Sequence, residues 1–178
     1  MNDTGARGDV MRHVVALLMA CALTLHLAKA LGAAPAVADS FRQLQSLAGD
    51  WQGMDDRGHP VRSNFQRIAS GTAVMETLSP TGMEEMVTLY SIDRDAITLI
   101  HYCPTNNRPR MRAIPNPDRL GSLVFEFQDA SNLASVAEGH EHKLVIDFRD
   151  HDHIDEHWTW RRDGSDTEMT FRLVRTKP

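Results

Sequence analysis

No apolar run in this sequence is long enough to cross a membrane as a helix. The longest, residues 14–28, has about 15 residues, whereas a spanning helix needs roughly 20. It follows two arginines, Arg7 and Arg12, and precedes the small residues of Ala36-Val37-Ala38. A basic start, a short apolar run and a small-x-small sequence are typical of an export signal. We therefore expect residues 1–38 to be a signal peptide cleaved after Ala38, and the protein to be periplasmic or secreted without stable membrane insertion.

Cysteine is nearly absent. The chain has two cysteines, and Cys21 lies within the expected signal peptide, which leaves Cys103 alone in residues 39–178. A domain with one cysteine cannot form an internal disulfide, so a small disulfide-stapled fold is excluded. The 140 residues that remain after cleavage are enough for a single domain with one hydrophobic core.

Basic residues are fewer than acidic residues in this sequence. Lysine and arginine number 19 against 24 aspartates and glutamates, which gives a formal net charge of −5. The expected signal peptide contains three basic and two acidic residues, so the mature chain carries −6. An acidic chain without a basic stripe is not expected to bind nucleic acid or anionic membranes. The partner classes that remain are a small-molecule ligand and a second copy of the chain in a homodimer.

Short alternating strands follow one another from Trp51 to near Lys177, with turn signals about every ten residues. Apolar residues occupy every second position at Leu123, Phe125 and Phe127. This alternation is typical of a strand with one buried face and one solvent-exposed face. Strands at this spacing predict a barrel or sandwich rather than a parallel α/β sheet. We predict an all-β fold, a ten-stranded antiparallel up-and-down barrel, with strands centred near residues 51, 65, 76, 88, 100, 111, 125, 146, 157 and 171.

A short helix is expected before the first strand. Ser40 and Gln43 have the spacing of a capping box, and Phe41, Leu44 and Leu47 follow at helical spacing. This pattern predicts a helix over residues 40–48 that packs against the barrel as a lid or plug. Together with Trp51, such a helix closes one end of the barrel.

Three short segments carry a resemblance to a known family. Leu47-Ala48-Gly49-Asp50-Trp51, together with His101-Tyr102-Cys103 and Pro109-Arg110-Met111, resembles a family of exported bacterial proteins of unknown function with a lipocalin-like (calycin) β-barrel. The resemblance implies the fold more firmly than any activity, because one fold hosts many functions. It also implies that Trp51 packs against an arginine of a late strand, Arg172 or Arg175.

Turn lengths predict which polar side chains point into the barrel. A two-residue turn at Arg94-Asp95 places Thr88 opposite His101. A turn over residues 104–107 places His101 opposite Arg110, and a turn at residues 80–82 places Glu76 beside Met86. The inward-facing candidates for ligand binding are His101, Arg110, Glu76, Glu156, Met86, Tyr90, Cys103, Trp51, Trp158 and Trp160.

These residues support several functions. Arg110 with Glu76 or Glu156 can form a buried salt bridge that only fixes strand register. Arg110 and His101 can instead anchor the carboxylate or hydroxyl of a small, partly apolar ligand. His101 with Glu76 can serve as the acid–base pair of an isomerase- or lyase-like enzyme, although no activated nucleophile or oxyanion site is visible. A binding protein is therefore favoured over an enzyme.

Metal or haem binding is the third class of function. His101 and Cys103, with Met86 near, are suitable ligands for haem iron or copper(I), but no cofactor motif identifies one. The histidine-rich segments contain His140, His142, His151 and His153. A strand of about nine residues separates the two histidine pairs by roughly 25 Å or more, so the pairs cannot share one metal ion.

Overall fold

The computed structural model describes residues 33–116 and 121–176. The chain separates between Pro35 and Ala36 into two units, and the barrel belongs to the second. The N-terminal helix is α2 (Ala33–Ser46), and a short 3-10 helix, η1 (Ala69–Gly71), follows the second strand. Most of the expected signal peptide lies outside the described residues.

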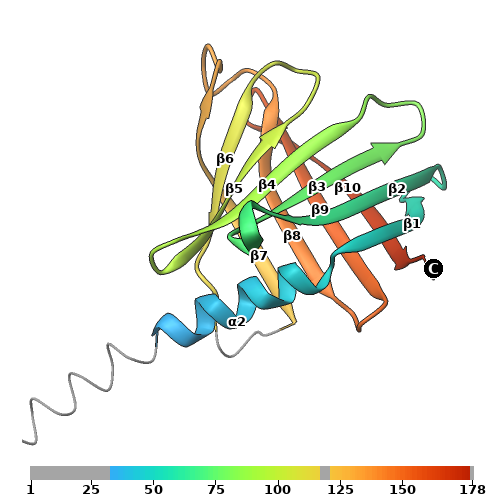
Figure 1. Ribbon diagram of the computed structural model, residues 1–178. Helices are drawn as coiled ribbons and strands as arrows, with labels where there is room; N and C mark the ends of the chain where they lie inside the picture. Colours follow the sequence, from blue (N-terminus) through green and yellow to red (C-terminus); the bar gives the residue numbers. More distant parts are fainter. Residues whose placement is uncertain (1–32, 117–120, 177–178) are drawn as a thin grey trace, which may run out of the picture. The chain divides into compact units, whose positions relative to one another are not determined.

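Ten strands form one closed antiparallel barrel in which each strand pairs with the next and β1 pairs with β10 (Figure 1). The predicted all-β class, strand number and meander are therefore confirmed. The strands are β1 (Gly49–Asp55), β2 (Pro60–Ile68), β3 (Ala73–Pro80), β4 (Met86–Asp93), β5 (Ala96–Tyr102), β6 (Arg108–Ala113), β7 (Ser122–Ser131), β8 (His140–Phe148), β9 (His153–Arg162) and β10 (Ser165–Arg175).

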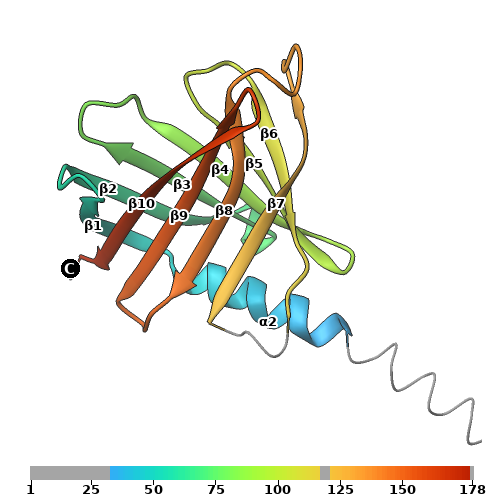
Figure 2. The ribbon, with the colours of Figure 1, turned by 180° about the vertical axis from the view of Figure 1, so that it is seen from behind.

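The barrel closes along the seam between β1 and β10, which Figure 2 shows from behind. Gly53 lies opposite Leu173 in this seam. A Cβ atom at Gly53 would lie 1.8 Å from the backbone oxygen of Arg172, whereas one at Gly121 would meet nothing within 4 Å. The close approach of the first and last strands therefore requires a residue without a side chain at position 53.

Helix α2 covers one end of the barrel, which we call the closed end (Figure 1). Val37, Phe41, Leu44 and Leu47 are buried in the same core as the barrel interior. The spacing of the first three places them on one face of the helix, and Leu47 directly follows its last residue, Ser46. The predicted apolar face is confirmed.

The start of this helix differs from the expectation. Residues 40–48 were expected to be helical, but α2 begins at Ala33 and ends at Ser46. Ser40 therefore lies inside the helix, and the predicted capping box is wrong. Alanine has the highest helix propensity, and the alanines before Ser40 extend the helix by about two turns. The expected cleavage position after Ala38 lies within α2, and Val37 just before it is only 4% exposed.

Trp51 and Arg175 attach the helix to the first and last strands. The Trp51 Nε1–H donates to the carbonyl oxygen of Leu47 at 2.8 Å. The Arg175 guanidinium lies 4.3 Å above the Trp51 ring and donates to the carbonyl oxygens of Ser46 and Ala48, each at 2.9 Å. A cation is favourable at a helix C-terminus, where carbonyls lack partners within the helix. The expected contact between Trp51 and a late arginine is confirmed, with Arg175 rather than Arg172.

Candidate functional site

The hairpin registers decide which polar residues enter the barrel. Thr88 lies opposite His101, and Tyr90 opposite Leu99, as the two-residue turn predicts. Glu76 lies opposite Thr88 rather than beside Met86. This shift of two residues leaves Glu76 on the inward face, because side chains alternate with a period of two.

The register predicted for Arg110 is wrong. Arg110 lies opposite Ile100 instead of His101, because the connection between β5 and β6 closes one residue earlier than expected, with Asn106 in the left-handed region at φ 66°. A slip of one residue turns every side chain to the other face. The Arg110 side chain is 54% exposed and pairs with Asp129. It neither forms the predicted salt bridge with Glu76 or Glu156 nor reaches the interior.

Two carboxyl groups lie in the barrel interior, and no basic side chain of the described residues forms an ion pair with either. Glu76 and Glu156 are both fully buried. Glu76 accepts hydrogen bonds from the Ser63 hydroxyl at 2.9 Å and the Tyr90 hydroxyl at 2.8 Å, and Glu156 accepts one from Trp158 Nε1 at 3.1 Å. Burial and the neighbouring Glu76 raise the pKa of Glu156 well above its ordinary value. Burial also raises the pKa of Glu76, and Oε1 of Glu156 has no hydrogen-bond partner among the described residues. Two buried carboxyl groups next to one another therefore favour retention of a proton by the pair.

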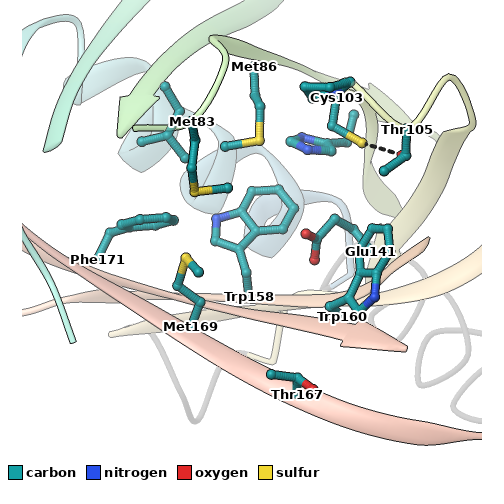
Figure 3. Close-up of a pocket in the computed structure, with 13 residues that line it drawn as sticks. Met83, Met86, Cys103, Thr105, Glu141, Trp158, Trp160, Thr167, Met169 and Phe171 are labelled. Carbon is teal, nitrogen blue, oxygen red and sulfur yellow. Dashed lines mark hydrogen bonds between the residues drawn. The ribbon is translucent and has the colours of Figure 1, made fainter. Parts of the chain in front are cut away.

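A cavity of about 400 Å³ lies at the other end of the barrel, which we call the open end. Its wall is almost entirely apolar, and the side chains of Met83, Met86 and Met169 point into it around the indole of Trp158 (Figure 3). The lining residues are Leu78, Met83, Met86, His101, Cys103, Pro104, Thr105, Glu141, Trp158, Trp160, Thr167, Met169 and Phe171.

His101 contributes one of the two buried polar atoms of this cavity that have no hydrogen-bond partner among the described residues. Its Nδ1 lies 2.9 Å from the Thr88 hydroxyl, and its ring lies 4.5 Å from the Trp158 ring. The Nε2 atom is buried and has no hydrogen-bond partner among the described residues. Burial lowers the pKa of His101 to about 4. The imidazole is therefore neutral at pH 7 and offers Nε2 to the cavity.

Glu141 is the second such group, and sequence reasoning missed it. Its Oε2 is buried without a partner among the described residues, and burial raises the pKa of its carboxyl group to about 7. A β-bulge at His142 breaks the alternation of β8, so that Glu141 pairs with Trp160 while Lys143 pairs with Thr159. Strict alternation along β8 from Leu144 places Glu141 outside. Only the bulge, which the sequence does not reveal, turns this carboxylate into the cavity.

Trp160 forms the wall beside Glu141 because position 139 lacks a side chain. A Cβ atom at Gly139 would lie 2.3 Å from the Trp160 ring. Because Gly139 has no side chain, the Trp160 indole can occupy this space. Glu141 and Trp160 face the cavity from neighbouring strands (Figure 3).

The ten candidate residues thus separate into three groups. Met86, His101, Cys103, Trp158 and Trp160 line the cavity. Glu76, Tyr90 and Glu156 lie in the barrel interior beyond its lining, and Trp51 lies at the closed end; all four are buried. Arg110 lies outside. Met169 and Phe171 of β10, which are not among the ten candidates, also line the cavity.

The histidine-rich segments make contacts of other kinds. The rings of His140 and His142 pack on Phe127, and His142 Nε2 lies 2.6 Å from the guanidinium of Arg161. His151 and His153, in the turn beyond the far end of β8, contact neighbouring aspartates. Within residues 33–116 and 121–176, no three histidine, cysteine or acidic residues are grouped as a metal site.

The fold and the site define a class: a closed ten-stranded antiparallel barrel with a mostly apolar cavity at one end. Among the described residues, no helix is both long and apolar enough to span a membrane. No protein-family model matches the sequence, and no curated protein matches it. The fold is similar to the crystal structure of Rv2717c from M. tuberculosis, with a TM-score of 0.56 and 14% identity over 79% of this chain and 99% of that chain. At this identity the similarity shows the barrel fold alone.

Proposed function

We propose that this chain is an exported, lipocalin-like protein that binds a small, partly apolar molecule in the cavity at the open end. The observation that carries the proposal is the presence of two buried, unpartnered polar atoms, His101 Nε2 and Glu141 Oε2, in one otherwise apolar cavity. Buried polar atoms are nearly always hydrogen-bonded, and each one left without a partner costs about 1–3 kcal/mol. A ligand that hydrogen-bonds to both atoms removes this cost.

The wall of the cavity supports the same proposal. A volume of about 400 Å³ is within the usual range for small-molecule sites, and such sites combine an apolar wall with a few polar groups. Met83, Met86 and Met169 are flexible side chains that adapt to irregular apolar shapes. Trp158 and Trp160 add flat surfaces on which an aromatic or aliphatic group can lie.

An enzyme that uses His101 and Glu76 as an acid–base pair has less support. Glu76 hydrogen-bonds to Ser63 and Tyr90, whereas His101 contacts Thr88. A histidine whose pKa is about 4 is also a weak general base at neutral pH. Binding is therefore the function that we propose, and the homodimer remains a prediction from the sequence.

Binding of the neutral fluorescent probe N-phenyl-1-naphthylamine tests the proposal. The wild-type protein is expected to enhance the probe's fluorescence with saturation at one site. Met169→Trp and Thr167→Trp fill the cavity from β10 and are expected to abolish the enhancement. Met54→Trp is the matched control, because Met54 is 51% exposed on the barrel surface. Absence of probe binding to the wild type, or full binding to both filled variants, contradicts the proposal.

Export is tested separately in a bacterial host by fractionation and intact mass. A periplasmic or secreted form that begins at Asp39 is the expected result. Full-length protein confined to the cytoplasm contradicts this part of the proposal and leaves ligand binding unaffected.

A further inference from the structure

We infer that the ligand of the open-end cavity carries a positively charged nitrogen, as in an apolar primary amine or a quaternary ammonium compound. This inference rests on the proposed binding function and names the chemical class of the ligand. Three features of the cavity support it: the sign of its charge, the aromatic surfaces beside that charge, and the absence of a cation for an acidic ligand.

The charge of the cavity comes from Glu141. Among the lining residues that the structure describes, Glu141 is the one carboxylate, and none is lysine or arginine. No ion pair of Glu141 occurs among the described residues, and its Oε2 has no hydrogen-bond partner. An isolated buried carboxylate is unfavourable unless an opposite charge approaches it. A ligand ammonium group supplies that charge.

Aromatic rings form part of the wall of the cavity that this carboxylate faces. Trp160 is the cross-strand partner of Glu141, and Trp158 and Phe171 also line the cavity. In Figure 3 the Glu141 carboxylate points into the cavity on the side of the two indole rings. The face of a tryptophan ring attracts ammonium and quaternary ammonium groups, and more strongly when water is excluded. A carboxylate beside two indoles is therefore suited to an organic cation.

The same surroundings disfavour an acidic ligand. Arg110, the guanidinium expected to hold a ligand carboxylate, lies outside the barrel. His101 is neutral near pH 7 because burial lowers its pKa, so it provides a hydrogen bond without a positive charge. A ligand carboxylate in this cavity meets the like charge of Glu141 and no opposite charge. His101 Nε2 is available as a second contact for an ammonium or hydroxyl group.

Four ligands with one apolar scaffold test the inference: 4-phenylbutylamine, (4-phenylbutyl)trimethylammonium, 4-phenylbutan-1-ol and 4-phenylbutanoate. Their affinities are measured by isothermal titration calorimetry at pH 8, where Glu141 is largely ionised. Both cations are expected to bind at least about ten-fold more tightly than the alcohol, because interactions with charged groups in buried sites exceed neutral hydrogen bonds. The carboxylate is expected to bind most weakly.

Glu141→Gln and Glu168→Gln provide matched variants that remove the same charge. Glu141→Gln should reduce the affinity for both cations to that for the alcohol and leave the affinity for the alcohol within about two-fold. Glu168 is the neighbour of Met169 on the exposed face of β10, so Glu168→Gln should retain the preference. In the wild type the affinity for the quaternary cation should also rise between pH 6 and 8 as Glu141 ionises, whereas Glu141→Gln should show no such rise.

The outcomes separate this inference from the proposed function. Binding of the neutral probe without a preference for cations, or a preference that survives Glu141→Gln, overturns the inference alone. Absence of binding by the probe and by all four phenylbutyl compounds overturns the proposed function as well.

Discussion

The two ends of the barrel differ in how their polar groups are used. At the closed end, the Trp51 indole N–H donates to a carbonyl near the end of α2, and Arg175 donates to two more. At the open end, His101 Nε2 and Glu141 Oε2 have no partner among the described residues, and a cavity takes the place of a helix. Under the proposed binding function, the closed end stabilises the fold, whereas the open end retains polar groups for a ligand.

Removing one tryptophan at each end tests this contrast most strongly. Trp51 is fully buried against Phe65 and Arg175, so Trp51→Ala should lower the free energy of unfolding by about 3–5 kcal/mol. Trp160→Ala, at the cavity wall, should lower it by less than about 1.5 kcal/mol and weaken probe binding. Urea denaturation followed by far-UV circular dichroism measures both. Equal losses of stability at the two positions contradict the assignment of stability to the closed end.

The β1–β10 seam is expected to give the next largest effect. Gly53→Ala forces a Cβ atom against the backbone oxygen of Arg172, and overpacking of this kind costs about 1–3 kcal/mol. Gly121→Ala places the same atom in open space and should change stability by less than about 0.5 kcal/mol. Thermal unfolding of the two variants side by side makes the comparison. If Gly53→Ala is as stable as Gly121→Ala, the proposed steric limit at the seam is contradicted.

The buried carboxyl pair predicts a dependence of stability on pH. Glu156 keeps its proton in the folded state above the ordinary glutamate pKa, because burial and Glu76 raise its pKa. The folded chain then binds more protons than the unfolded chain, so the free energy of unfolding falls as pH rises above about 4.5, by at most about 1.4 kcal/mol per pH unit. Glu156→Gln removes this contribution.

Urea denaturation between pH 5 and 8 checks this prediction. The stability of Glu156→Gln should increase relative to the wild type as the pH rises. Glu141, whose pKa is raised to about 7, acts in the same direction between pH 4.5 and 7. His101, whose pKa is lowered to about 4, acts in the opposite direction between pH 6.5 and 4. Both are present in each protein, so the difference isolates the carboxyl pair. Parallel stability curves would show that Glu156 does not retain a proton.

The fold was predictable from sequence where local signals sufficed. Alternation fixed the strands, and the two-residue turn at Arg94-Asp95 fixed Thr88 opposite His101, because such a turn allows one register. Trp51 and its late arginine followed from the family resemblance.

The site was less predictable, because two of its features depend on single-residue offsets. A longer loop allows more than one register. The register predicted for the β5–β6 connection therefore placed Arg110 on the wrong face of the sheet. The bulge at His142 arises from pairing across strands β8 and β9, which no local pattern records, and Glu141 was missed for that reason. Offsets of one residue leave strand positions almost unchanged but exchange the inside and outside of the barrel.

Gly139 controls the position of one wall of the cavity at the open end. Because the Trp160 indole occupies the space where a side chain would begin, alanine or serine at this position must displace this ring, which lines the cavity. A single substitution outside the lining would thus change the shape of the cavity wall at Trp160 and leave the carboxylate of Glu141 and the imidazole of His101 in place. If the cavity binds a ligand as proposed, the shape of its wall and its charge can therefore be altered independently.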